Sequence, residues 1–229
     1  MARTKIDWAD ETWNPVWGCT YGCSFCYARK LAQRFSKQVA QWNNVNEKAL
    51  KEFKPTFLPK NFWRKLTGRV IFVNSMSDLS DWKFMWFQQV LSRIKEMPDK
   101  IFLFLTKRPN EVWQYFYVSS DIPENCWFGV SATTGKELVE RVKELSEFKH
   151  EFHDNLFASF EPMLGPFKAD KSLLSLKWII FGAQTNPKKL PRAKDLLEAT
   201  QWFKENDVPV FHKENLAEVG IELLKEFPF

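Results

Sequence analysis

Short, continuous runs of apolar residues recur along the chain at intervals of roughly 22 to 31 residues. Each run is rich in Ile, Val and Phe, and none alternates strictly between apolar and polar residues. This pattern is typical of strands that are buried on both faces, as in a parallel sheet. The six runs begin at Val70, Ile101, Cys126, Leu156, Trp178 and Val208.

Charged segments of helical length separate these runs, for example residues 81–97. Strands that alternate regularly with helices predict βαβ units. A further short strand is expected within residues 11–18, where Pro15 would suit its edge or its end. The sequence thus predicts an α/β fold with six or seven parallel strands. We expect a single domain over residues 1–229, with an irregular insertion or cap at about 36–65.

Polar side chains follow the predicted strands one after another. The carboxyl ends of the strands in a parallel α/β barrel share one face, and that face carries the site. An ordinary loop or helix-capping role would explain any one of these residues, but their recurrence favours a site. They are Ser75, Ser77, Asp78, Thr106, Lys107, Arg108, Ser131, Glu161, Gln184, Lys213 and Glu214.

The net charge of +5 hides an asymmetry between the two halves of the chain. Between Arg29 and Arg69, 11 basic residues stand against two acidic residues, Glu47 and Glu52. A basic block of this kind suggests an anionic partner, and a solvated helical face is the simpler alternative. Five aromatic residues are interleaved with these cations and would either stack on nucleic-acid bases or form a local core. They are Trp42, Phe53, Phe57, Phe62 and Trp63.

No apolar run approaches the roughly 18 residues that a membrane-spanning helix needs. The N-terminal residues also lack the apolar stretch of a secretory signal. We therefore expect a cytoplasmic protein without a membrane partner. Thiols stay reduced in that compartment, so clustered cysteines indicate metal ligands or redox groups rather than disulfides.

Three of the four cysteines lie within eight positions, in the spacing C-x3-C-x2-C. A structural zinc ion would need a fourth ligand, which would have to be the distant Cys126 or a histidine. A [4Fe-4S] cluster fits better, because three thiolates leave one iron with an open coordination site. Gly18 and Gly22 would let the backbone approach the cluster closely. The predicted ligands are Cys19, Cys23 and Cys26.

These three cysteines, with Phe25 before the last, resemble the signature of the radical S-adenosylmethionine superfamily. The resemblance implies a partial (β/α)6-type TIM barrel with the cluster in the loop after the first strand. It also implies that the open iron binds S-adenosylmethionine, whose reductive cleavage yields a 5′-deoxyadenosyl radical. An external electron donor of the flavodoxin or ferredoxin type would then be a partner.

A narrower similarity covers most of the chain. The segments "TWNPVWGC", "FVNSMSDL", "LTKRP", "FGVSATT" and "SFEPMLGP" resemble a phage-associated family of predicted radical S-adenosylmethionine proteins with an unassigned substrate. The opening is also similar to relatives of spore photoproduct lyase, which repair a DNA lesion. Two departures stand out: "NSMSD" replaces the superfamily's Gly-Gly-Glu, and "GAQT" replaces the narrower family's Gly-Gly-Glu-Ser.

The resemblance and the strand-end pattern together suggest roles for the polar residues. S-adenosylmethionine would be contacted by Phe25, Ser75, Ser77, Ser131 and Glu161. Asp78, as a proton donor or positioning group, and Lys107 are the predicted catalytic residues. Substrate would be contacted by Arg108, Gln184 and Lys213.

Three hypotheses follow. The first is a radical enzyme that acts on a nucleic acid or a nucleotide-like anion. The second is a nucleic-acid-binding module whose iron–sulfur cluster or zinc ion is structural. The third is a thiol redox protein that uses Cys23 and Cys26, which would leave Cys19 and the polar strand ends unexplained.

Overall fold

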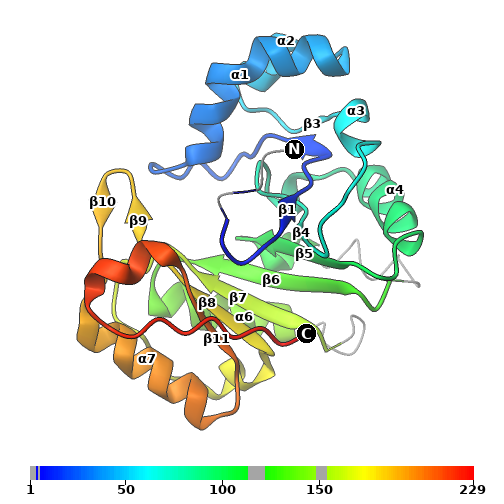
Figure 1. The fold of residues 1–229 in the computed structure, drawn as a ribbon. Coiled ribbons are helices and arrows are strands. Elements are labelled where there is room, and N and C mark those ends of the chain that lie inside the picture. The colour runs from blue at the N-terminus through cyan, green and yellow to red at the C-terminus, as the bar shows by residue number, and fades with distance from the viewer. Residues whose placement is uncertain (1–3, 5, 113–121, 148–153) are drawn as a thin grey trace. The chain divides into compact units, whose positions relative to one another are not determined.

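The computed structural model describes residues 4, 6–112, 122–147 and 154–229 (Figure 1). The fold is of the predicted α/β class, with a seven-stranded sheet in the order β1-β4-β5-β6-β7-β8-β11. The pairings of β1 with β4, β4 with β5, β6 with β7, β7 with β8 and β8 with β11 are all parallel. This is the arrangement of a partial TIM-barrel-like fold. The strands are β1 (Glu11–Thr12), β4 (Val70–Phe72), β5 (Ile101–Thr106), β6 (Cys126–Ala132), β7 (Leu156–Phe160), β8 (Trp178–Phe181) and β11 (Val210–His212).

Each of the six apolar runs contains one of these strands, which confirms the hydrophobic pattern as the signal for the sheet. The seventh strand, β1, lies in the segment before Cys19 and ends before Pro15, as expected. The described helices are α1 (Tyr27–Asn43), α2 (Glu47–Lys51), α3 (Pro59–Phe62), α4 (Phe84–Lys95), α6 (Gly135–Ser146) and α7 (Ala193–Glu205). The 3-10 helices are η1 (Leu79–Asp81), η3 (Lys171–Ser175) and η4 (Glu214–Val219). Two short antiparallel pairs are also described: β2 (Val16–Trp17) with the distant β3 (Thr56–Phe57), and β9 (Gln184–Thr185) with β10 (Lys188–Lys189), which form a hairpin.

The chain divides into two compact units. The first comprises residues 1–104 and 114–126, and the second comprises residues 105–113 and 127–229. The first unit contains the cysteine loop and the helices α1 to α4, and the second contains α6 and α7. The prediction of a single domain stays a prediction.

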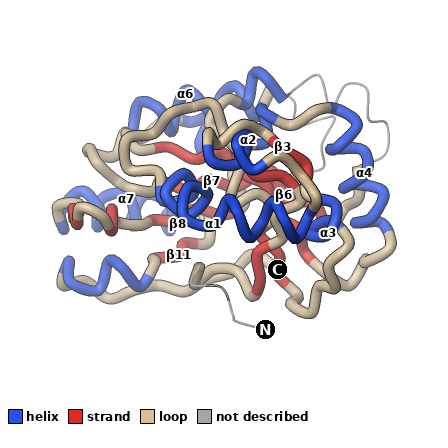
Figure 2. Tube along the Cα trace, turned by 90° about the horizontal axis from the view of Figure 1, so that it is seen from above, coloured by secondary structure: helices blue, strands red, loops and turns tan. Residues whose placement is uncertain are grey.

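The expected cap at 36–65 begins inside a regular helix, because α1 continues to Asn43. Asn43 is buried, and its side chain accepts hydrogen bonds from the backbone N–H groups of Lys60 and Asn61 at 3.0 and 3.2 Å. The end of α1 is thereby attached to α3. Figure 2 shows α1 and α2 lying side by side. The segment contains the end of α1, then α2, β3 and α3, and its role as an insertion or cap stays a prediction.

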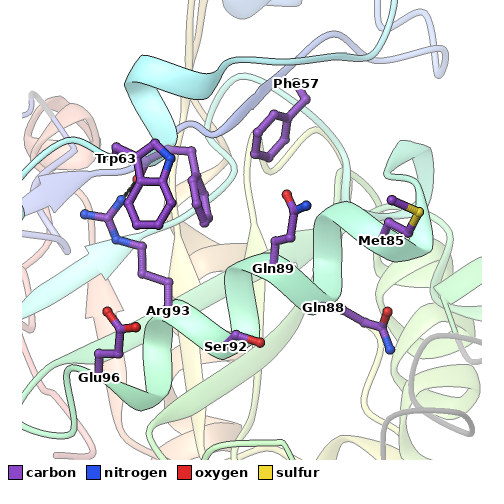
Figure 3. A pocket seen from close by; sticks show the side chains of 9 residues that line it. Phe57, Trp63, Met85, Gln88, Gln89, Ser92, Arg93 and Glu96 are labelled. Atoms are coloured by element: carbon purple, nitrogen blue, oxygen red, sulfur yellow. Dashed lines mark hydrogen bonds between the residues drawn. The ribbon is translucent and has the colours of Figure 1, made fainter.

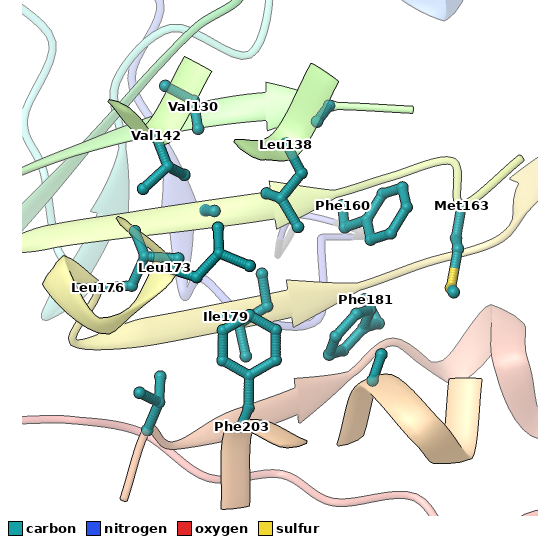
Figure 4. Packing of buried hydrophobic residues seen from close by; sticks show 14 of the residues in the cluster. Val130, Leu138, Val142, Phe160, Met163, Leu173, Leu176, Ile179, Phe181 and Phe203 are labelled. Atoms are coloured by element: carbon teal, nitrogen blue, oxygen red, sulfur yellow. The ribbon is translucent and has the colours of Figure 1, made fainter. Parts of the chain in front are cut away.

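The core of the second unit is formed by the inward faces of β6, β7 and β8 together with α6 and α7 (Figure 4). On α6 the buried residues Leu138, Val142 and Leu145 recur with helical spacing, which places one apolar stripe against the sheet. Phe160 and Phe181 meet across neighbouring strands with ring centroids 6.1 Å apart. The alternate residues Phe157, Trp178 and Ile180 are also fully buried, so these strands are covered on both faces, which explains why their apolar runs are continuous.

His212, at the end of β11, is fully buried and hydrogen-bonded through both ring nitrogens. The backbone N–H of Leu224 donates to Nδ1 at 3.1 Å, so Nε2 carries the proton and lies 2.9 Å from Thr200 Oγ1. Burial, reinforced by the positive charge of Lys225, lowers the pKa of His212 from 6.5 to about 4. The ring is therefore neutral in the folded protein at neutral pH.

We expect His212 to make the folding stability pH-dependent. The pKa of His212 is lower in the folded than in the unfolded protein. Its contribution to the free energy of unfolding is therefore fully present above about pH 6.5. That contribution falls as the pH drops toward 4, by about 3 kcal/mol in all. Urea denaturation between pH 4 and 7.5 measures it. The variant His212→Gln should be less stable at pH 7 but should lose less stability on acidification; an equal acid slope in both proteins would contradict this assignment.

No helix in the described part of the chain is long and apolar enough to cross a membrane.

Candidate functional site

The three clustered cysteines lie in one loop of the first unit, between β2 and α1 (Figure 1). Cys26 is the N-cap of α1, and its Sγ accepts a hydrogen bond from the backbone N–H of Arg29 at 3.3 Å. Cys23 is joined to Cys26 by a backbone hydrogen bond of 3.2 Å. Cys19 Sγ accepts from the backbone N–H of Tyr21 at 3.4 Å. The loop therefore presents thiols that already accept N–H donors, as cluster sulfurs do.

Backbone hydrogen bonds attach the start of this loop to two neighbouring segments. The N–H of Gly18 donates to the carbonyl of Met76 at 3.0 Å, and the N–H of Cys19 donates to the carbonyl of Phe53 at 3.0 Å. Gly18 has a φ of 113°, and a Cβ there would lie 2.3 Å from the backbone of Lys54. Only glycine fits this position, because both its conformation and its surroundings exclude a side chain.

Side chains fix the remainder of the loop. Arg29 donates to the carbonyl of Cys19 at 3.2 Å, and its guanidinium lies 5.2 Å from the ring centre of Phe53. Asp81 accepts from the N–H and the hydroxyl of Thr20, at 2.9 and 2.7 Å. Cys19 and Cys26 pack against the small apolar cluster that contains Phe53. The loop therefore packs on apolar side chains on one side, and side-chain hydrogen bonds hold it on the other.

The thiols differ in their surroundings. Burial raises the pKa of Cys19 to about 12; the N–H of Tyr21 opposes this rise, and the nearby Asp78 and Asp81 add to it. A metal that binds Cys19 must therefore displace a proton. Cys126 is 1% exposed, and burial raises its pKa strongly as well. It opens β6, separate in sequence and surroundings from the loop, as expected.

None of the four cysteines, all of which lie in the described ranges, is in a disulfide, and the three in the loop are half-buried. Their type, spacing and partial exposure fit an iron–sulfur cluster rather than a buried structural residue. The three thiols are not already gathered: within the described ranges, no three His, Cys, Asp or Glu side chains form a group that could hold a metal ion. The donor set fits, and the loop would have to close for all three thiolates to bind.

The polar residues after β4 lie beside the cysteine loop in the same unit. Gly18 and Ser77 form a parallel β-bridge. Ser75 Oγ exchanges hydrogen bonds with the Asn14 carboxamide at 2.9 and 3.1 Å, and Ser77 Oγ accepts from the indole of Trp82 at 2.9 Å. Both predicted S-adenosylmethionine ligands therefore already serve the local structure.

Asp78 and Phe25 occupy this neighbourhood too. Asp78 is buried and caps η1, since its carboxylate accepts from the N–H and the hydroxyl of Ser80 at 3.1 and 2.8 Å. Phe25 is half-buried in the turn before Cys26. The catalytic role of Asp78 and the adenine contact of Phe25 stay predictions.

The second unit brings together four other predicted residues in two pairs. Lys107 donates to Ser131 Oγ at 2.8 Å, and Lys213 forms an ion pair with Glu161. The latter pair is half-buried, with side chains 15% and 23% exposed. Gly182 leaves room for Glu161, because a Cβ there would lie 2.8 Å from the Glu161 side chain.

Arg108 and Gln184 are used locally in this second unit. Arg108 pairs with Glu111, one turn further along, at 3.3 Å. Gln184 donates to the carbonyl of Pro187 at 2.8 Å within the β9–β10 hairpin. Their predicted contacts with substrate stay predictions.

The five aromatic residues of the basic segment separate into two groups. Phe53 and Phe62 are 2% and 6% exposed, so they belong to the local core. Trp42 and Trp63 are 62% and 70% exposed. Phe57 is half-buried. Burial thus supports the local-core reading for Phe53 and Phe62, and the stacking of Trp42 and Trp63 on bases stays a prediction.

A family model described as "Protein of unknown function (DUF5131)" matches residues 3–218. The chain belongs to this family. No curated protein and no solved structure matches the chain. In this DUF5131 chain the match includes both the cysteine loop and the polar strand ends.

Two residues of the DUF5131 chain, Asn14 and Tyr27, make structural hydrogen bonds that the sequence did not predict. Asn14 accepts from the backbone N–H of Met76 at 3.0 Å, besides its contact with Ser75. Tyr27 donates its hydroxyl to the carbonyl of Ser75 at 2.8 Å. The only hint of these roles in the sequence is that both residues lie in the same short segment as the three cysteines. Their partners are roughly 50 to 60 residues away in sequence, so their roles depended on the fold.

Proposed function

We propose that this protein is a radical S-adenosylmethionine enzyme that holds a [4Fe-4S] cluster on Cys19, Cys23 and Cys26 and acts on a nucleic acid or a nucleotide-like anion. The observation that carries the proposal is the loop itself. It presents three half-buried thiols that form no disulfide, between a strand pair and a helix, and backbone hydrogen bonds fix it to neighbouring segments. A structural zinc site would need a fourth ligand, and Cys126 is fully buried elsewhere.

When bound, the cluster would supply the electron that cleaves S-adenosylmethionine to a 5′-deoxyadenosyl radical. The chain's own residues position and shield this chemistry. The apolar cluster around Phe53 and Met76 excludes water from one side of the loop. The N–H groups of Tyr21 and Arg29 donate to two of the sulfurs, which stabilises negative charge on them.

Two further features support roles in binding. The Lys107–Ser131 pair and the Lys213–Glu161 pair lie at the carboxyl ends of strands, where α/β proteins place their ligands. Their cations would suit the carboxylate of S-adenosylmethionine or a substrate phosphate. The electron would come from a flavodoxin- or ferredoxin-type protein.

The nucleic-acid partner is supported by the exposed face of α1. This helix contains no acidic residue, and it exposes Lys30, Arg34 and Lys37 with helical spacing. None of the three makes an ion pair within the described part of the chain. Further along, the exposed Trp42 has Lys60 Nζ 4.6 Å from its ring centre. Since Cys26 caps the start of α1, a strand bound along this face would lead toward the cysteine loop.

The proposal is tested by S-adenosylmethionine cleavage. Anaerobically reconstituted protein should contain about four irons. With a strong reductant it should convert S-adenosylmethionine to methionine and 5′-deoxyadenosine, both measured by chromatography. The electron-paramagnetic spectrum of the reduced cluster should change when S-adenosylmethionine is added. A fully loaded cluster that ignores S-adenosylmethionine and forms no 5′-deoxyadenosine would defeat the radical-enzyme proposal and leave the nucleic-acid-binding module as the better candidate.

A further inference from the structure

An open groove of about 640 Å³ lies in the first unit, between α3 with its flanking residues and one face of α4 (Figure 3). Its volume is in the range of small-ligand sites. The opposite face of α4, with Phe87, Val90 and Ile94, is buried in the core. The groove therefore lies on a firmly packed helix. No residue of the proposed cluster site lines it.

Trp63 borders this groove as a large apolar side chain that is 70% exposed yet held in place. Its ring meets Phe62 edge-on, with centroids 4.8 Å apart. The guanidinium of Arg93 lies 5.2 Å from the Trp63 ring centre. Arg93 is itself fixed, because it donates to the backbone carbonyls of Phe62 and Arg64. Such a pre-positioned ring binds a planar partner at little cost in conformational entropy.

The polar groups of the groove suit a neutral, hydrogen-bonding ligand. Gln89 extends from α4 toward the space between Trp63 and Phe57 (Figure 3). Its carboxamide makes no side-chain hydrogen bond to any described residue. The charge of Arg93 is already engaged with two carbonyls and three aromatic rings. The groove thus offers aromatic walls, a free amide donor and acceptor, and no free cation for a phosphate.

We propose that this groove binds a nucleobase of the nucleic-acid strand, stacked against Trp63 and hydrogen-bonded by Gln89. A carboxamide can both donate and accept along the edge of a base, and adenine presents the matching pair. Cations lie along the flanking helices rather than in the groove: Lys60 on α3, Lys83 before α4 and Lys95 at its end are all exposed. They would hold the phosphates on either side of the base. The inference rests on the proposed nucleic-acid substrate and is independent of the radical chemistry.

The test measures binding of the full-length protein, with its iron content determined, to a fluorescent oligodeoxyadenylate of about twelve nucleotides. A matched abasic strand and free AMP serve as the other probes. The variant Trp63→Ala should weaken oligodeoxyadenylate binding about 5- to 150-fold, the range for one stacked base. It should leave abasic binding nearly unchanged, and Trp63→Phe should restore most of the loss. The exposure of Trp63 means that the alanine variant should keep its fold.

A second pair of variants tests the polar contact on the same helix. Gln89→Leu should lower affinity for oligodeoxyadenylate about tenfold, within the range of one base contact. Its neighbour Gln88 is also exposed and also lines the groove, but its side chain points away from Trp63 and Phe57 (Figure 3). Gln88→Leu should therefore have little effect and controls for helix stability and surface polarity.

The possible outcomes distinguish a failure of the base site in the groove from a failure of the proposed nucleic-acid partner. If no strand binds and AMP binding does not depend on Trp63 and Gln89, the proposed polymer partner fails and this inference with it. If strands bind with a salt-dependent affinity that Lys30→Glu, Arg34→Glu and Lys37→Glu leave unchanged, only the proposed path along α1 is overturned. If strands bind but Trp63→Ala and Gln89→Leu match the wild type, only the groove assignment is overturned. If AMP binds with the same dependence on Trp63 and Gln89 while strands do not, the base site holds and its ligand is a free nucleotide.

Discussion

Replacement of Cys19, Cys23 or Cys26 by alanine is expected to abolish iron incorporation, whereas Cys126→Ala should leave about four irons per chain. In the proposed site each loop cysteine would supply one of three ligands, so the loss of any one would leave two irons of the cluster without a protein ligand. Cys126 is 1% exposed and opens a strand of the sheet, so its thiol acts as a small apolar core group. Iron and sulfide analysis after anaerobic reconstitution gives the result directly.

Thermal unfolding of the same variants provides the control. The loop thiols are half-buried, so their replacement should change the stability of the metal-free protein only slightly. Cys126→Ala removes a buried sulfur and should cost about 1 kcal/mol while the cluster is kept. Loss of iron from the Cys126 variant would overturn the three-ligand assignment and revive a closed four-ligand site.

Gly18→Ala is expected to destabilise the cysteine loop far more than Gly22→Ala, although both glycines have positive φ values of 113° and 80°. At Gly18 an added Cβ would lie 2.3 Å from the carbonyl carbon and oxygen of Lys54, which belong to the backbone and cannot rotate away. At Gly22 the nearest atom would be 3.9 Å away. Gly22→Ala should therefore carry only the left-handed conformational cost of about 1–2 kcal/mol. Gly18→Ala should cost about 3 kcal/mol or more.

Two measurements distinguish these variants. The unfolding free energy from urea titration should fall in the order wild type, Gly22→Ala, Gly18→Ala. Cluster content should fall sharply only for Gly18→Ala, since moving the backbone of Cys19 breaks its bond to the carbonyl of Phe53. Equal behaviour of the two variants would show that the contact between Gly18 and Lys54 does not shape the loop.

The proposed activity and the groove concern different faces of the same unit. The cysteine loop would supply thiolate ligands above an apolar cluster. The groove would supply the exposed ring of Trp63 and the carboxamide of Gln89. A substrate strand that used both would be held by base stacking at one point and by charge along α1.

The sequence by itself determined the sheet, because its strands are buried on both faces and so read as continuous apolar runs. Each run from Val70 to Val208 contains a strand, whereas the strand before Cys19, Glu11–Thr12, has no apolar run of this kind and was expected only within residues 11–18. The C-x3-C-x2-C spacing likewise identified the candidate ligands, since three cysteines within eight positions stay close together in any fold. Local periodicity and short spacings are properties that the chain order alone expresses.

Only the tertiary structure decided which polar residues are already hydrogen-bonded to other groups of the protein. Ser75, Ser77 and Asp78 looked like ligand groups at a strand end, yet each makes hydrogen bonds to Asn14, Trp82 or Ser80. Some of these partners are close in sequence, but sequence does not show which way a side chain turns. The same holds for the aromatic residues of the basic segment. Burial of Phe53 and exposure of Trp63 depend on which distant segments pack against them, and that packing is set by the sum of long-range contacts rather than by any local pattern.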